Sequence, residues 1–267
     1  MLYSYSRVSL FEKCPLAYKY RYVRRLKPKG KSIEAFMGWQ VHKAIEYFFQ
    51  GKKSGGTPTV SDVLAYFRDS WSSRFSEDIF INREGYTTGD YLNKGEEMIE
   101  FFVGDNLGFD GSRIIGIEKR VHADLFGDGR LRFIGFIDRL DCLDDGVYEI
   151  HDYKTSRRLP SEKQLLKDRQ LCVYEKAVRQ VHPEADKIVH VWHYLAHKNK
   201  YELTRTPQQL NEAVEGLSSS VSEIESAVDS DCFPANKSRL CGWCEYKLIC
   251  QDDDKTGGCR QSRLAEY

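Results

Sequence analysis

Two carboxylates and a lysine with strand-like spacing are the residues of this 267-residue sequence most suited to chemistry. Asp152 and Lys154 stand two positions apart in YEIHDYKTSRR, and Asp138 lies in the preceding segment GFIDRLD. In a β-strand, side chains two positions apart lie on the same face. The sequence therefore predicts an acidic and a basic group side by side on one sheet face, together with the apolar residue Ile150.

The turn between these segments decides which carboxylates face each other. A three-residue loop, 144–146, with Gly146 in the left-handed conformation, pairs residue 143 with residue 147 and places Asp138 opposite Asp152. A two-residue loop would instead put Asp152 on the other face. The face opposite to these carboxylates is expected to be solvated near the turn, and it carries Arg139, Asp141, Glu149 and His151.

Two carboxylates opposed on a half-apolar face repel each other, or one of them takes up a proton. A divalent cation between them removes the conflict, and Mg²⁺ typically binds one or two carboxylates plus waters. Lys154 could then orient or deprotonate a water, or neutralise charge that develops on a phosphate. The segment is thus typical of half a metal-dependent phosphodiesterase site. The alternative is a charged hairpin with a surface ion pair.

Hydrophobic periodicity predicts the elements that position these residues. Helices are expected over residues 4–26, 34–50, 61–76, 90–104, 161–181 and 207–228. Strands are expected over residues 113–125, 131–142, 147–155, 187–195 and 200–205. The pattern predicts one α/β domain with helical and cysteine-bearing additions.

The composition is that of an ordinary globular protein, with 30% charged and 41% hydrophobic residues and a formal net charge of +0. This balance argues against indiscriminate binding to polyanions but allows a local basic patch. No run approaches the roughly 18 apolar residues that a membrane span needs, and the start lacks the features of a secretory signal. We therefore expect a cytoplasmic protein without a membrane partner, in a compartment where disulfides are rare.

Cysteines crowd the end of the chain with the spacing Cys241-x₂-Cys244-x₅-Cys250. A tetrahedral site needs a fourth ligand, for which Cys14 is the candidate and Cys259 the alternative. Four thiolates suit a structural Zn²⁺ or an iron–sulfur cluster, and the spacing does not separate the two. Either would tie the first helix to the C-terminal segment.

Residues 19–31, KYRYVRRLKPKGK, hold seven basic residues with Tyr20 and Tyr22 between them. Basic groups for phosphates and aromatic rings for bases are typical of single-strand binding. The alternative is a solvated charged loop. Arg157 and Arg158, which follow the predicted active-site lysine, are better placed to reach a phosphate near the metal.

The order of several motifs resembles the RecB-like branch of the PD-(D/E)XK nuclease superfamily. These motifs are GWQVHKAIE (38–46), GFIDRLD (135–141), HDYKT (151–155) and RQLCVY (169–174). The terminal segments SYSRVSLFEKCPLAYKYRYV (4–23) and CGWCEYKLIC (241–250) are similar to those of members with an iron–sulfur cluster. Those members include CRISPR-associated RecB-like exonucleases and the nuclease domains of AddB-type helicase–nucleases.

The resemblance implies a restriction-endonuclease-like fold, in which helices flank a mixed central sheet. It implies a single nuclease domain over residues 1–267, with a mainly helical part over 1–110 and a nuclease core over 111–206. A C-terminal helix and a cluster-binding tail would occupy residues 207–267.

The resemblance also implies a metal site. It makes His42, Asp138 and Asp152 ligands of Mg²⁺ or Mn²⁺, with the Tyr153 carbonyl as a further one. Glu118, on the strand before the hairpin, could join the same metal shell.

Beside the metal, the resemblance makes Lys154 the catalytic lysine. Gln170 and Tyr174 match the branch's Gln-x-x-x-Tyr motif, lie on one helical face, and could hold DNA or the lysine in place. The sequence departs from the motif after which the superfamily is named, because Ile137 stands where the motif has a proline before the first aspartate.

These residues imply a metal-dependent deoxyribonuclease, an exonuclease at single-stranded DNA or DNA ends in recombination, repair or CRISPR spacer processing. The resemblance favours a [4Fe–4S] cluster on the four cysteines, with zinc as the alternative, and a helicase or a CRISPR integrase as partner. The alternative function is a non-catalytic iron–sulfur DNA-binding subunit of a recombination or spacer-acquisition complex.

Overall fold

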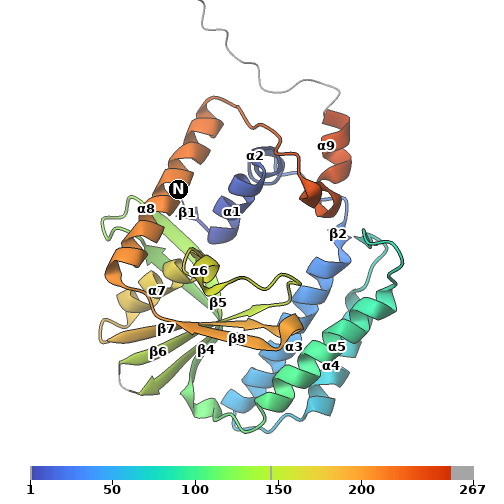
Figure 1. Cartoon of the computed structure of the whole chain (residues 1–267), viewed down its shortest axis with the longest axis vertical. Helices are drawn as coiled ribbons and strands as arrows, with labels where there is room; N and C mark the ends of the chain where they lie inside the picture. Colours follow the sequence, from blue (N-terminus) through green and yellow to red (C-terminus); the bar gives the residue numbers. More distant parts are fainter. Residues whose placement is uncertain (1, 145, 254–267) are drawn as a thin grey trace, which may run out of the picture.

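A mixed β-sheet forms the centre of the molecule (Figure 1). The structure, a computed structural model, describes residues 2–144 and 146–253. Within that part of the chain, the sheet has six strands: β1 (Leu2–Tyr3), β4 (Ile114–Asp124), β5 (Arg132–Asp144), β6 (Val147–Lys154), β7 (Lys187–Tyr194) and β8 (Asn199–Leu203). The long strand β5 pairs antiparallel with β4 and β6 and parallel with β1, β6 pairs parallel with β7, and β7 pairs antiparallel with β8. The mixed α/β fold expected from the sequence is confirmed.

Helices cover both faces of the sheet (Figure 1). The long helices are α3 (Ile33–Lys53), α4 (Val60–Arg74), α5 (Thr88–Asp105), α7 (Gln170–Val181) and α8 (Pro207–Asp229). Helices α3, α4 and α5 pack together and share one buried cluster with Ile114 and Tyr153 of the sheet. A second buried cluster joins β5, β6 and β7 to α7, α8 and the N-terminal helix α1 (Tyr5–Lys13).

The shorter elements complete the chain. They are α2 (Pro15–Tyr18), α6 (Glu162–Leu165) and α9 (Lys247–Asp253), the parallel pair β2 (Lys31–Ser32) and β3 (Ile79–Phe80), the π-helix η1 (Lys19–Val23), and the 3₁₀-helices η2 (Gly111–Arg113), η3 (Leu195–His197) and η4 (Arg239–Trp243).

Side-chain caps set where the site-bearing and flanking helices begin. Ser32 accepts a hydrogen bond from the backbone N–H of Ala35 and so starts α3. Threonine residues with an acidic or amide residue three positions later form capping boxes at α4, α5 and α8. These caps satisfy backbone N–H groups that the first helical turn leaves without partners. They are readable in the sequence, and the predicted starts of these helices agree with the structure to within three residues.

Two long predicted helices are each broken, which corrects the sequence-based expectation. The predicted helix 4–26 stops at Cys14 and restarts at Pro15, whose ring removes a backbone donor inside a helix. The predicted helix 161–181 divides into α6 and α7, and between them the Asp168 side chain accepts a hydrogen bond from the N–H of Gln170, the first residue of α7.

The hairpin register agrees with the expectation, although the turn does not. Asp144 pairs with Val147, so the loop has two residues and the predicted pairing of residues 143 and 147 is wrong. A bulge between Cys142 and Asp144 adds one residue to β5 and offsets the shorter loop. Beyond the bulge, Arg139 pairs with His151. Continued by one step, this register brings Asp138 opposite Asp152.

The expectation of a solvated opposite face is wrong. Arg139, Asp141 and His151 are 3%, 0% and 4% exposed. Helix α3 and the segment after α5 cover them, with the Phe49 and Phe109 rings 4.1 and 4.7 Å from the Arg139 guanidinium carbon. Charged side chains in a hairpin predict solvent exposure only where no other element packs on that face.

Candidate metal centre

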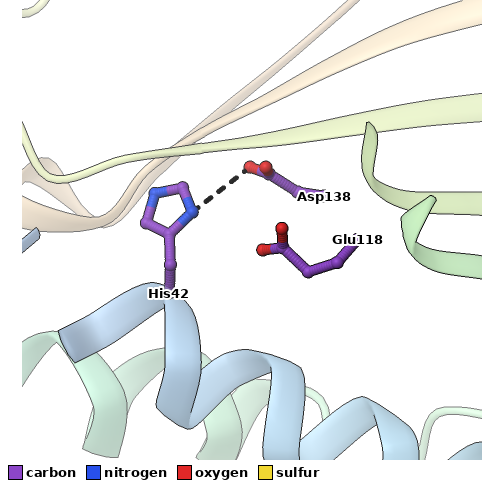
Figure 2. A group of neighbouring side chains, drawn as sticks. All are labelled: His42, Glu118 and Asp138. Carbon is purple, nitrogen blue, oxygen red and sulfur yellow. Dashed lines mark ion pairs between the residues drawn. The ribbon is translucent and has the colours of Figure 1, made fainter. Parts of the chain in front are cut away.

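His42, Glu118 and Asp138 offer ligand atoms that all lie within 4.8 Å of one another. Figure 2 shows His42 pointing from α3 toward two carboxylates carried by the sheet, with its Nδ1 3.6 Å from Asp138 Oδ2. An imidazole and two carboxylates are a donor set that suits Mg²⁺, Mn²⁺ or other divalent cations. Residues 42, 118 and 138 therefore form a candidate metal site.

Glu118 has an unusual backbone. Its φ is +46°, the left-handed region that residues other than glycine rarely adopt. It lies between Ile117, which pairs with Arg139, and Lys119, which pairs with Ile137, so it is level with Asp138. Such a conformation costs about 1–3 kcal/mol and is common at functional sites. The sequence contains no signal for this conformation.

Asp138 and Asp152 are crowded carboxylates. Burial and the neighbouring Asp152 charge raise the pKa of Asp138 to about 7, although the Tyr153 N–H donates to its Oδ2 at 2.8 Å. Burial also raises the pKa of Asp152, and Lys154 acts in the opposite direction. Crowded anions of this kind are stabilised by a divalent cation, so the donor set fits the metal that the sequence predicts.

The imidazole of His42 is in the form that binds metals. Burial lowers its pKa despite the nearby Asp152 charge, so the ring is neutral at physiological pH. A hydrogen bond to the backbone of Tyr153 acts in the opposite direction on this pKa, so the Tyr153 backbone lies beside the ring.

Lys154 is held by a chain of polar contacts. Its Nζ lies 2.7 Å from Asp152 Oδ2 and donates to Gln170 Oε1 at 3.1 Å. Gln170 Nε2 in turn donates to the Tyr174 hydroxyl at 3.2 Å. Burial alone would lower the pKa of Lys154, but Asp152 raises it above its ordinary value, so the ammonium stays charged. Gln170 thus contacts Lys154 directly, and Tyr174 contacts Gln170.

Two glycines of the motifs allow close approach. A Cβ at Gly135 would lie 2.3 Å from the Tyr174 ring, and a Cβ at Gly38 would lie 2.8 Å from Thr155 Oγ1. The first glycine lets α7 place Tyr174 against β5. The second lets α3 approach the end of β6, so His42 reaches the carboxylates.

A family model described as the PD-(D/E)XK nuclease superfamily matches residues 3–251. The chain belongs to the PD-(D/E)XK nuclease superfamily. Among solved structures, the fold is similar to a protein from Eubacterium rectale described as a "putative exonuclease", with a TM-score of 0.52 and 14% identity over 98% of this chain and 92% of that chain. No significant match was found among curated proteins. No helix of the described residues is long and apolar enough to cross a membrane.

The candidate metal site of this PD-(D/E)XK nuclease lies in a cavity of about 430 Å³. Besides the three ligand candidates, the cavity is lined by Glu34, Ala35, Gly38, Trp39, Lys43 and Thr155. Trp39 and Lys43 belong to none of the ligand or catalytic positions that the motifs predict. Their positions one turn before and one residue after His42 on the same helix could have indicated them.

Asp168 is a further residue near the site that the sequence motifs did not predict. Its side chain accepts a hydrogen bond from the Gln170 N–H, and its negative charge raises the pKa of both Lys154 and Asp152. Its place two residues before Gln170 was the available signal, because an aspartate side chain commonly accepts a hydrogen bond from the backbone N–H two residues later.

The cysteines of the two chain ends lie together. Cys14, Cys244 and Cys250 pack in one small cluster around the buried Tyr20 and Tyr246 rings. Burial raises the pKa of Cys244, and the neighbouring Cys14 and Cys241 thiols raise it further. Cys14 therefore lies beside the C-terminal segment, and its role as a ligand stays a prediction. The alternative ligand, Cys259, lies outside the described residues.

The basic segment 19–31 differs from the prediction in its aromatic residues. The Tyr20 ring is buried against Tyr246, with ring centroids 5.6 Å apart, and is not available to a base. Tyr22 is half-buried and packs against Tyr18. The Tyr20 ring packs the cysteine segment onto η1, a contact that the local sequence does not reveal.

Proposed function

We propose that the protein is a divalent-metal-dependent deoxyribonuclease, an exonuclease of the RecB-like branch that acts on single-stranded DNA or duplex ends. The observation that carries the proposal is the convergence of His42, Glu118 and Asp138 at one open cavity, with Lys154 and Asp152 on the adjacent strand. The exonuclease assignment draws on the motif resemblance and on the description of the Eubacterium rectale protein.

His42, Asp138 and Asp152 would hold Mg²⁺ or Mn²⁺, with Glu118 and the Tyr153 carbonyl as further ligands. When bound, the cation supplies positive charge at the scissile phosphate and lowers the pKa of a water. The left-handed backbone of Glu118 keeps its carboxylate level with Asp138. The neutral His42 ring is ready to donate a lone pair without first losing a proton.

Lys154 would neutralise the charge that develops on the phosphate. Asp152 and Gln170 hold the ammonium from two sides, and Tyr174 holds the Gln170 amide. Positioning of this kind supplies much of the catalysis in phosphoryl transfer, where the protein forms few covalent bonds itself. Arg157 and Arg158 are exposed in the loop after β6 and would contact the DNA backbone.

The four cysteines would carry a [4Fe–4S] cluster, with structural zinc as the alternative. The cluster would join α1 to the C-terminal segment and organise one domain over the chain, in the cytoplasm, where thiols remain reduced. Protein purified without oxygen should be brown with about four irons per chain. Cys14→Ser should lower stability more than Cys142→Ser. A colourless protein with one zinc per chain would show that the four cysteines bind structural zinc and not an iron–sulfur cluster.

The test of activity uses end-labelled single-stranded and duplex DNA with Mg²⁺ or Mn²⁺. We expect stepwise shortening from an end, which Lys154→Ala abolishes and the exposed-surface variant Lys163→Ala leaves unchanged. Equal activity of the Lys154→Ala protein would reject the site. Tight DNA binding with no cleavage by either metal would favour the non-catalytic subunit, the alternative function.

A helicase or a CRISPR integrase remains the partner that the motif resemblance suggests. A pull-down with either partner would test this part of the proposal separately from the cleavage assay.

A further inference from the structure

Trp39 is an exposed aromatic residue at the mouth of the candidate metal centre. It precedes His42 by one helical turn on α3 and lines the same cavity. Its side chain is 38% exposed, whereas Phe36 and Phe48 on the same helix are buried in the core. Packing therefore does not explain an aromatic ring at this position.

Two cations lie beside this ring. The Arg74 guanidinium carbon lies 5.0 Å from its centre and the Lys31 Nζ lies 6.0 Å away. Lys43, one turn further along α3, lines the same cavity and contacts Glu46 at 2.5 Å. Positive charge beside a solvent-exposed ring attracts the phosphates of a strand whose bases can stack on the ring.

A second aromatic surface lies further along α3 and on the neighbouring helix α4. The rings of Tyr47 on α3 and Tyr66 on α4 stack at 4.6 Å with an interplanar angle of 5°, and both are exposed. Tyr47 lies eight residues beyond Trp39, about 12 Å along the helix. Trp39, Lys43 and Tyr47 follow one another at four-residue spacing, so they lie along one side of α3.

We propose that Trp39 stacks on a base of a single-stranded nucleic acid whose backbone passes the metal centre, and that the strand continues along α3 toward Tyr47 and Tyr66. The proposal rests on the proposed function and assigns the determinant of its strand preference. Bases of a duplex are already stacked and paired, so the ring gains less from them. Single strands offer free base faces of any sequence.

Binding to labelled oligonucleotides tests the proposal in the Lys154→Ala background, where the DNA stays intact. Adding Trp39→Ala should weaken single-strand binding about tenfold and leave duplex binding nearly unchanged. Trp39→Phe should keep most of the affinity. The matched control is Phe101→Ala, because Phe101 is also 38% exposed, also has a cation 5.0 Å from its ring, and does not line the cavity.

Oligonucleotides with a single abasic position locate the contact. In the parent protein, one base deletion should weaken binding as much as Trp39→Ala does, and the same deletion should have no further effect in the Trp39→Ala variant. Equal single-strand binding by the Trp39→Ala, Phe101→Ala and parent proteins overturns the proposal. So does a result in which the loss of affinity from Trp39→Ala adds fully to the loss from an abasic site, wherever in the oligonucleotide that site is placed. Failure of the proposed function would show differently, as the absence of cleavage by the unsubstituted protein.

Discussion

Two charged clusters share strands β5 and β6 but lie on opposite sides of the sheet. Asp138 lines the cavity and belongs to the open cluster, together with the buried Asp152 opposite it, while their sequence neighbours Arg139 and His151 belong to a cluster that is buried throughout. In the buried cluster, Arg139 Nε lies 3.1 Å from Asp141 Oδ1 and His151 Nε2 lies 3.3 Å from Asp141 Oδ2.

The clusters differ in how their negative charge is compensated. Asp141, Glu149 and His151 also have metal-like spacing, but the Arg139 guanidinium contacts Asp141 and so already supplies a cation. In the open cluster, His42 is neutral and Lys154 is the nearby cation on the strand, bound to Asp152 and Gln170. Carboxylates with an internal guanidinium form a structural network, whereas carboxylates crowded around a neutral imidazole can bind a metal.

Asp141→Asn should have the largest effect and should affect stability alone. It leaves a buried guanidinium without its partner, which costs about 3–5 kcal/mol of unfolding free energy. Urea unfolding measures the loss, and cleavage per folded molecule should be unchanged. A fully folded Asp141→Asn protein that has lost metal binding would show that the buried cluster is part of the active site.

Asp138→Asn, three positions away, should have the opposite pattern. Loss of one charge from the metal site should reduce cleavage by about 10²–10³-fold. The unfolding free energy of the metal-free protein should stay the same or rise, because repulsion from Asp152 is removed. Isothermal titration with Mn²⁺ and a cleavage assay measure the change, and a destabilised protein with normal metal affinity would contradict the comparison.

Gln170→Ala should have a smaller effect that is confined to catalysis. The variant removes a contact of Lys154 and not the charge, so the rate constant for cleavage should fall about 10–100-fold, the range for partners that orient a metal site. Gln208→Ala, at the exposed start of α8, is the control. A Gln170→Ala protein with normal kcat would remove Gln170 from the positioning of Lys154.

The smallest expected effect is the contribution of His193 to the pH dependence of stability. Burial and the nearby His151 and Arg139 hold its pKa well below the ordinary value of 6.5. The unfolded chain therefore takes up a proton first as the pH falls below 6.5, and this group makes the folded state less stable there but has no effect above it.

The slope from this one proton is at most about 1.4 kcal/mol per pH unit. Urea unfolding between pH 5 and pH 8 should show a shallower acid slope for His193→Phe than for the parent protein. Identical slopes would mean that the pKa of His193 is not lowered in the folded protein.

Much of the fold and the hairpin follows from local patterns in the sequence. Strand alternation predicted that residues 138, 152 and 154 share a face, and turn chemistry predicted a left-handed Gly146, whose φ is +84°. The bulge near Cys142 was not predictable, because it depends on how β5 pairs rather than on residue type. The helix break before α7 had a local signal in Asp168, but it lies inside a continuous apolar pattern.

The amino-acid sequence by itself determined which residues could do chemistry, their order along the chain, and their spacing on strands and helices. Only the tertiary structure decided which side of the sheet stays open. Helix α3 brings His42 to Asp138 across 96 positions of sequence, and its Phe49 helps to cover the face of Arg139. Burial depends on what packs across a face, which is a non-local property, so a strand pattern alone cannot distinguish an open acidic site from a closed ionic network.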